Sequence, residues 1–297
     1  MKMEEYTYRT LCEDMLTLKT QFPFLQMGSI GKSLCGRTLY RTEIGTGRDA
    51  VLFAAAFHGM ERITAALLVQ FFTALSRAFR DDSMLQGVRI RPLLSARRLC
   101  LLPCINPDGI EISIFGAQRA GEYASFVRAH AGGDLCRWQA NARGVDLNHN
   151  FDADWMALRK LEIEQGYCSP GPTRFGGYAP ESEPESFALA RFCREENFLY
   201  ALAFHTQGEE IYYRYGDDTP PGARKMAEAL AASSGYTLSE PEGIASMGGF
   251  KDWFIHSLRR PGFTIEAGLG QNPLPPSDLP TLYQRLEPML VTALQLS

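Results

Sequence analysis

Three largely apolar segments constrain the fold of this chain of 297 residues more than any other feature. They occupy residues 50–57 (AVLFAAAF), 98–104 (RLCLLPC) and 199–204 (LYALAF). Apolar runs of this kind are typical of strands that are covered on both faces, as in a parallel sheet. Segments with helical spacing of apolar residues separate them, as at 61–79 and 185–196. The alternation predicts an α/β fold, in which a mixed, mostly parallel open sheet carries helices on both faces.

Turn and breaker residues divide the rest of the chain into shorter elements. The segment 106–109 (NPDG) is typical of a turn, 115–139 of a loop with a short helix, and the Gly- and Pro-rich segment 166–184 of a loop. No repeat, low-complexity tract or linker divides the sequence, so we expect a single domain over residues 1–297. The other expected elements are helices at 6–22, 156–165, 220–235, 249–258 and 278–296, and strands at 28–31, 38–44, 210–215 and 262–265.

Charge and composition exclude several classes of function. The chain carries 30 Lys and Arg against 34 Asp and Glu, a net charge of −4, without a basic run. We therefore expect neither nucleic acid nor an anionic membrane surface as its partner. No apolar run is long enough for a transmembrane segment, and the first residues lack the pattern of a signal peptide, which predicts a cytoplasmic location. Seven irregularly spaced cysteines without a CxxC pair predict buried thiols rather than disulfides.

Residues that can bind a metal or move a proton follow three of the expected strands. His58 and His205 come directly after the first and third apolar segments, and Glu266 follows a later short strand. Ligands of open α/β sheets bind beyond the carboxyl ends of the strands, so we expect these residues at one site. Gly59 allows a sharp turn after the strand, which brings Glu61 toward the same ion. Two histidines and one carboxylate with an open fourth position are the pattern of a catalytic zinc site.

Each of these residues also has a purely structural interpretation. A histidine at the end of a buried strand can be a core residue with a backbone partner, and an Asp beside a glycine can make a local Asx hydrogen bond. Asp146, in GVDLN (144–148), fits either that turn or the carboxylate that orients a metal-binding histidine. Two histidines and two glutamates gathered at strand ends favour the metal site.

Five segments, in the same order and over most of the chain, resemble the zinc carboxypeptidase family. The resemblance implies that family's fold and a zinc-dependent hydrolase that cleaves peptide bonds. It implies one Zn²⁺ per chain, held by His58, Glu61 and His205, with Glu266 activating the attacking water. By the same resemblance, Asp146 is the carboxylate behind the first zinc histidine. The segments are HGME (58–61), INPDG (105–109), ARGVDLNHNF (142–151), FHTQGEE (204–210) and FTIEAG (263–268).

The departures from the family pattern concern substrate binding. Asn148 matches an asparagine that holds the terminal carboxylate of the substrate, but His149 follows it where the family usually has the arginine that clamps this group. A histidine cannot make the same two-pronged contact. The oxyanion arginine that follows a Trp in the family is Gln139 here, and Arg143 is the candidate substitute. Lys251 occupies the specificity position of the pocket segment ASMGGFKDW (245–253), where a cation favours an acidic side chain.

Further segments resemble one bacterial branch of the family, the γ-D-glutamyl-meso-diaminopimelate peptidases of cell-wall peptides. The resemblance implies a muropeptide substrate with several carboxylates, and we place the cations Arg174, Arg214 and Lys251 around it. The alternative for each cation is a solvated surface charge. Three other functions stay open: a metallocarboxypeptidase that removes C-terminal residues, a zinc deacylase of N-acyl amino acids, and a binding domain without catalysis. The segments are PTRFGG (172–177), SEPES (182–186), FHTQGEEIYY (204–213) and EAGLGQNPLP (266–275).

Overall fold

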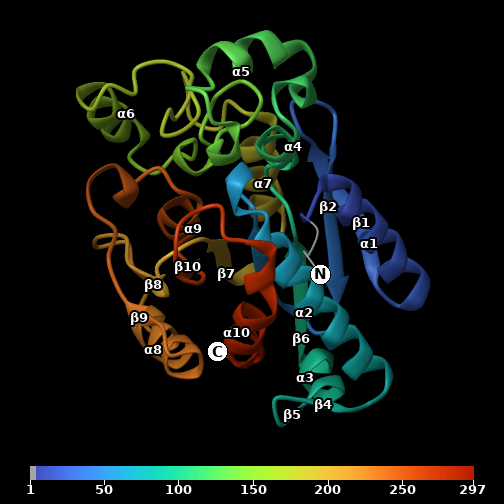
Figure 1. Ribbon diagram of the computed structural model, residues 1–297. Helices are drawn as coiled ribbons and strands as arrows, with labels where there is room; N and C mark the ends of the chain where they lie inside the picture. The colour runs from blue at the N-terminus through green and yellow to red at the C-terminus, as the bar shows by residue number, and fades with distance from the viewer. Residues whose placement is uncertain (1–4) are drawn as a thin grey trace.

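An eight-stranded sheet forms the centre of the protein, which a computed structural model describes over residues 5–297 (Figure 1). The strand order is β1-β2-β6-β3-β7-β10-β8-β9. The pairs β6–β3, β3–β7, β7–β10 and β8–β9 are parallel, and the pairs β1–β2, β2–β6 and β10–β8 are antiparallel. The predicted mixed, mostly parallel sheet is therefore confirmed. The strands are β1 (Gln26–Lys32), β2 (Thr38–Ile44), β3 (Asp49–Ala55), β6 (Arg97–Leu102), β7 (Phe198–His205), β8 (Glu210–Tyr212), β9 (Thr237–Leu238) and β10 (Gly262–Glu266).

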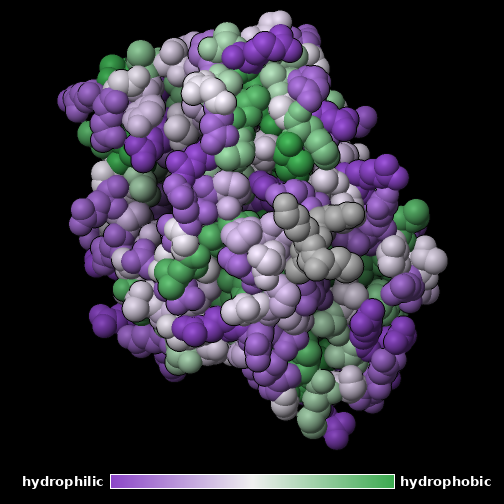
Figure 2. Space-filling view, viewed as in Figure 1, coloured by the Kyte–Doolittle hydropathy of each residue, from purple (hydrophilic) through white to green (hydrophobic). Residues whose placement is uncertain are grey.

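Helices cover both faces of this sheet, as predicted. One core packs α1 (Tyr8–Gln21), α2 (Ile63–Arg80), α8 (Ala223–Ser234) and α10 (Leu279–Ala293) against the first face. A second core packs α7 (Pro184–Glu195) and α9 (Phe250–Leu258) against the other face. In Figure 1, α2 and α10 lie on the side of the sheet that faces the viewer. The outer surface on that side mixes polar residues with small separate groups of apolar ones (Figure 2).

The segment between β6 and β7 covers the carboxyl ends of the central strands. It contains α4 (Pro107–Phe115), α5 (Ala124–His130) and α6 (Trp155–Glu164), which lie above the sheet in Figure 1. Part of this segment has a small core of its own around Ile112, Val127 and Trp138. Because it covers the strand ends from which His58 and His205 emerge, its polar residues can reach those histidines.

One local prediction is wrong. Residues 106–109 do not form an isolated turn but begin α4, because Asn106 is its N-cap and accepts a hydrogen bond from the N–H of Gly109 at 2.8 Å. Pro107 fits the first helical position, where no backbone donor is needed. The sequence interpretation also omitted α3 (Ile90–Ala96), β4 (Met84–Leu85), β5 (Val88–Arg89) and β9, which are too short to show a clear periodicity. Short 3-10 turns complete the structure at Gly59–Glu61, Ala117–Tyr123, Leu135–Arg137, Leu147–His149, Gly243–Ser246 and Pro276–Asp278.

The cysteines fit their prediction only in part. All seven are free, as expected, and Cys100, Cys104 and Cys193 are buried. Cys168 is exposed, which contradicts the expectation of buried thiols, because it lies in the loop that follows α6. Within residues 5–297, no helix combines the length and the apolar character needed to cross a membrane.

Candidate metal centre and active site

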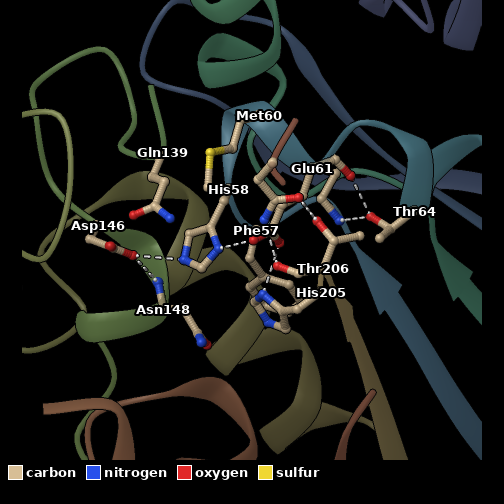
Figure 3. Close-up of polar contacts among 12 residues, drawn as sticks. Phe57, His58, Met60, Glu61, Thr64, Gln139, Asp146, Asn148, His205 and Thr206 are labelled. Carbon is tan, nitrogen blue, oxygen red and sulfur yellow. Dashed lines mark hydrogen bonds and ion pairs between the residues drawn. The ribbon is translucent and has the colours of Figure 1, made fainter. Parts of the chain in front are cut away.

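Two histidines and a glutamate converge at the carboxyl end of the sheet. His58 lies just after β3, Glu61 ends the short turn η1 (Gly59–Glu61), and His205 ends β7. The Nδ1 atom of His58 lies 2.9 Å from Oε1 of Glu61, and the Nδ1 atom of His205 lies 3.1 Å from Oε2 (Figure 3). The structure therefore brings together the three residues predicted to bind a metal.

These distances fit a metal ion. With Zn–N and Zn–O bonds of about 2.0 to 2.1 Å, neighbouring ligand atoms of a tetrahedral zinc lie about 3.3 to 3.4 Å apart. The two nitrogen–oxygen distances, 2.9 and 3.1 Å, are slightly shorter than that separation. Burial opposes ionisation of Glu61, but the adjacent imidazoles outweigh it and lower its pKa to about 2, so this carboxylate is ionised. His58, Glu61 and His205 can therefore hold one ion with little rearrangement.

The backbone between β3 and η1 is shaped for this convergence. Ala56 has a left-handed φ of 51°, which bends the chain away from the strand direction just before His58. The N–H of Gly59 donates to the carbonyl of Gln139 at 3.0 Å. A Cβ on Gly59 would lie 2.3 Å from the carbonyl of Gly109 in α4, so only glycine permits this close approach. The helix that the NPDG motif begins thus packs directly on the turn that carries two of the ligands.

Asp146 lies behind His58, on the side away from Glu61. Its Oδ1 is 3.1 Å from Nε2 of His58, and its Oδ2 accepts a hydrogen bond from the N–H of Arg174 at 2.9 Å. Oδ1 also accepts from the N–H of Asn148 at 3.2 Å, so the predicted Asx contact exists as well. Burial opposes ionisation of Asp146, but His58 outweighs it and holds the pKa well below its usual range. An ionised acceptor at Nε2 keeps the proton there and leaves Nδ1 free for a metal.

Glu266 occupies the end of the neighbouring strand. It is the last residue of β10 and pairs in register with His205 in β7. Its side chain lines the same cavity as the three metal-binding candidates. Burial and then the charge of Glu61 raise its pKa to about 8. A divalent cation between the two glutamates would oppose the charge of Glu61 and favour the ionised form of Glu266.

A cavity of about 420 Å³ opens over these residues. Four of the predicted substrate-binding residues line it, namely Asn148, His149, Arg174 and Lys251. Arg174 is exposed at the rim, where its guanidinium donates to the hydroxyl of Tyr167 at 2.7 Å and lies over that ring. Polar side chains therefore converge around the candidate metal site, and such groups can orient a ligand.

Two predicted arginines lie away from this cavity. Arg143 is held by Glu183, whose Oε2 accepts from its Nε and one terminal nitrogen at 3.1 and 3.0 Å. Arg214 pairs with Glu240 at 2.5 Å and lines a neighbouring groove. Neither side chain is among the residues that line the catalytic cavity. The positions next to the family motifs misled the sequence interpretation, because acidic partners distant in the sequence turn both guanidinium groups elsewhere.

Lys251 and Asn148 line the cavity but are already engaged by the protein. Lys251 is only 4% exposed, and its Nζ donates to the carbonyl of Arg214 at 2.6 Å and to the carboxylate of Asp252. Its charge is therefore balanced within the protein. Oδ1 of Asn148 accepts from the N–H of Phe250 at 3.0 Å, which leaves its amide nitrogen for a ligand.

The structure adds residues to the site that no motif indicates. Gln139 lines the cavity close to His58 (Figure 3), and the hydroxyl of Thr173 donates to its Oε1. Glu162, in α6, lies with its Oε1 2.7 Å from Nδ1 of His149. Gln139 was visible in the sequence as a departure from the family pattern. Glu162 gave no such signal, because α6 has no motif and reaches the site only through the folding of the covering segment.

The comparisons with known proteins agree with this geometry. The profile of the zinc carboxypeptidase family matches residues 11–287. The chain belongs to the zinc carboxypeptidase family. It is 38% identical to gamma-D-glutamyl-L-diamino acid endopeptidase 1 of Lysinibacillus sphaericus over 95% of this chain and 70% of that protein. It is also 26% identical to carboxypeptidase B of Bos taurus over 82% of this chain and 57% of that protein.

Solved structures of zinc carboxypeptidases share its fold. The crystal structure of thrombin activatable fibrinolysis inhibitor matches with a TM-score of 0.75 at 19% identity, covering 97% of this chain and 73% of the other. At that identity the likeness concerns the fold alone. As a member of a zinc-dependent peptidase family, the chain is a metallopeptidase and thus a hydrolase. The resemblance drawn from the sequence is confirmed.

Proposed function

We propose that this zinc carboxypeptidase hydrolyses the γ-D-glutamyl–diaminopimelate amide bond of cell-wall muropeptides, with one Zn²⁺ per chain bound by His58, Glu61 and His205. The observation that carries the hydrolytic part is the convergence of these three side chains in one cavity with Glu266. The substrate part is supported by the relative from Lysinibacillus sphaericus, whose name specifies γ-D-glutamyl-L-diamino acid bonds and whose sequence is 38% identical.

The residues of the chain divide the chemistry among them. A zinc ion held by His58, Glu61 and His205 would supply a Lewis acid for the scissile carbonyl and for the attacking water. Glu266 takes a proton from the attacking water and passes it to the leaving nitrogen. Asp146 holds the proton of His58 on Nε2, so that Nδ1 stays a ligand atom. Asn148, His149 and Arg174 line the cavity where the substrate chain would lie.

Gln139 is a better placed donor for the developing oxyanion than Arg143. Gln139 lines the cavity, whereas Arg143 is paired with Glu183 outside it. Because Thr173 donates to Oε1 of Gln139, the amide nitrogen is left free to donate to a ligand. An amide donor contributes less than a guanidinium but can still stabilise an oxyanion. We therefore assign the donor role to Gln139 and give Arg143 no contact with the substrate.

A substrate panel tests the proposed function. The zinc-loaded protein is incubated with L-Ala-γ-D-Glu-meso-diaminopimelate, a hippuryl peptide and an N-acyl amino acid, and the products are identified by mass spectrometry. We expect release of free diaminopimelate from the tripeptide. The Glu266→Gln variant is the inactive reference, and Glu228→Gln, an exposed change on α8, is the matched control.

Each other product pattern points to a different function. Cleavage of the hippuryl peptide alone would indicate a metallocarboxypeptidase, and cleavage of the N-acyl amino acid alone would indicate a zinc deacylase. A folded, zinc-loaded protein that cleaves none of the three would contradict the proposed hydrolysis and favour a binding domain. The cytoplasmic location stays a prediction, which fractionation of the source cells would test.

A further inference from the structure

His149 is held by a buried pair of charged residues on α6. Its side chain is 11% exposed, and Nδ1 lies 2.7 Å from Oε1 of Glu162, whose side chain is fully buried. Arg159, one turn earlier on α6, donates to Oε2 of Glu162 and lies over the ring of Phe175, 4.6 Å from its centroid. The ring of His149 is therefore fixed through one nitrogen, while the side chain still lines the catalytic cavity. Nε2 is the nitrogen left for a ligand.

Glu162 also holds the backbone that supports Asp146. Its Oε2 accepts from the N–H of Gly176 at 3.0 Å, and the carbonyl of Phe175 accepts from the N–H of Asp146 at 2.8 Å. A Cβ on Gly176 would lie 2.5 Å from the carbonyl of His149, so the two segments are in close contact. One buried carboxylate thus fixes both the substrate-facing histidine and the loop at Phe175 and Gly176 that supports Asp146.

The charges around His149 are balanced without a substrate. Glu162 and Arg159 face it from α6, Asp146 faces it from the loop before the short turn at Leu147–His149, and Asp252 faces it from α9. Asp252 is in turn paired with Lys251. This arrangement differs from an isolated guanidinium, which offers two parallel donors and an unopposed charge to a free carboxylate. His149 offers a ligand one nitrogen only.

A second groove lies beside the catalytic cavity. This groove of about 560 Å³ shares Glu240, Pro241 and Met247 with the catalytic cavity. The two spaces are therefore contiguous along the segment that precedes α9. A substrate chain that continues beyond the residue after the scissile bond has room there.

We propose that Glu162, with Arg159 behind it, is a positioning residue that fixes His149 with Nδ1 protonated. Nε2 then faces the substrate as a hydrogen-bond acceptor, which suits chains whose next carboxyl group is an amide rather than a free carboxylate. The proposal rests on the proposed function for the identity of the substrate. Its structural part, the fixed histidine, stands on the contacts of α6 alone.

Nitrogen NMR of the five histidines tests the structural part independently of activity. The His149 signals are assigned by their loss in His149→Gln. We expect a protonated Nδ1 and a chemical shift for Nε2 typical of the free nitrogen of that tautomer, with this pattern lost in Glu162→Gln. A proton on Nε2 alone in the wild-type protein would overturn the proposal, whichever substrate the enzyme cleaves.

Kinetics with two tripeptides test the functional part. One tripeptide has a free carboxylate on the residue after the scissile bond, and the other has a carboxamide there. We expect the wild-type enzyme to favour the carboxamide in kcat/KM by about 3- to 10-fold, because an unprotonated Nε2 accepts from an amide N–H and repels a carboxylate. Glu162→Gln should lower kcat/KM for the carboxamide by about 3- to 10-fold, mainly through KM, with unchanged zinc content. Glu164→Gln, an exposed change on the same helix, is the matched control.

A double-mutant cycle separates positioning from general stability. If Glu162 acts through His149, Glu162→Gln should have no further effect on kcat/KM in a His149→Ala background. A further tenfold loss in the double variant would refute the positioning role, and so would a tenfold preference of the wild-type enzyme for the free carboxylate. If Glu162→Gln does not fold, His149→Arg keeps the test, because it should create a preference of at least about tenfold for the free carboxylate. No cleavage of either tripeptide by wild type would refute the proposed function, while the NMR result would still decide the fixed histidine.

Discussion

The contact between Asp146 and His58 predicts how strongly the site holds its metal. In Asp146→Asn the side chain keeps its shape but loses one acceptor. In the wild-type protein, Oδ2 of Asp146 accepts from the N–H of Arg174 at 2.9 Å. If the amide nitrogen of Asn takes the place of Oδ2, two donors face each other there. If the amide is flipped, its nitrogen faces Nε2 of His58, which then gives up its proton to Nδ1. Nδ1 of His58, which lies 2.9 Å from Oε1 of Glu61, can no longer bind a metal once it is protonated.

Either arrangement should weaken zinc binding. Loss of such an outer contact typically reduces metal affinity by about 10- to 100-fold, which corresponds to about 1.4 to 2.7 kcal/mol. Competition with a chromophoric zinc chelator at pH 7.5 measures the affinity directly, without an activity assay. Asp152→Asn is the matched control, because Asp152 is exposed and lies six residues further along the chain. An unchanged zinc affinity in Asp146→Asn, with circular dichroism that confirms the fold, would refute the role assigned to Asp146.

Four further outcomes follow from the structure. Glu266→Gln should reduce kcat by about 100-fold or more while zinc content, measured by plasma emission, stays at one ion per chain. Treatment with a strong chelator should abolish hydrolysis, and stoichiometric zinc should restore it. Gly59→Ala should lower the free energy of unfolding by at least about 2 kcal/mol in urea titrations, because its Cβ would meet the carbonyl of Gly109 at 2.3 Å. Burial and then Asp108 raise the pKa of Glu185 to about 8. The folded protein therefore holds this proton more tightly than the unfolded chain does. The stabilisation from the bound proton is complete below the ordinary pKa of a glutamate and is lost as pH rises toward 8. Glu185→Gln should therefore flatten the decline of Tm between pH 5 and 8, and an unaltered slope would contradict that assignment.

The sequence predicted those parts of the molecule in which a local pattern and the final position coincide. The apolar strands, their order along the chain and the residues at their ends could be found because a residue that follows a buried parallel strand must emerge at the ligand-binding edge. His58, His205 and Glu266 are of this kind. The NPDG segment shows the opposite case, since the same residues are common in turns and at helix starts. Only the packing of α4 on Gly59 decides between them.

Three charged side chains could not be placed from the sequence. Arg143, Arg214 and Lys251 lie close in sequence to family motifs, which made Arg143 a candidate for the oxyanion donor and the other two candidates for substrate binding. In the structure their partners are Glu183, Glu240 and Asp252, and two of these partners are remote in sequence. Lys251 is buried and needs a carboxylate partner, because an unpaired buried charge is costly. The more exposed guanidinium groups of Arg143 and Arg214 turn toward the carboxylate that the fold brings close. Position beside a motif therefore predicts where a backbone lies better than where a long side chain points.

Three carboxylates around the metal site show how partners, rather than residue type, assign roles. Glu61 lies between two imidazoles, which keep it ionised and suit it to the proposed ligand role. Asp146 accepts from one imidazole and two backbone N–H groups, all on the side away from the ion, and so it orients His58. Among residues 5–297, no group donates a hydrogen bond to the side chain of Glu266, and its pKa is raised to about 8. A carboxylate that no donor holds is the one that can exchange a proton with a water near neutral pH. The proposed roles of ligand, support and base thus fall to the same residue type because the strands and the covering segment give each carboxylate a different set of neighbours.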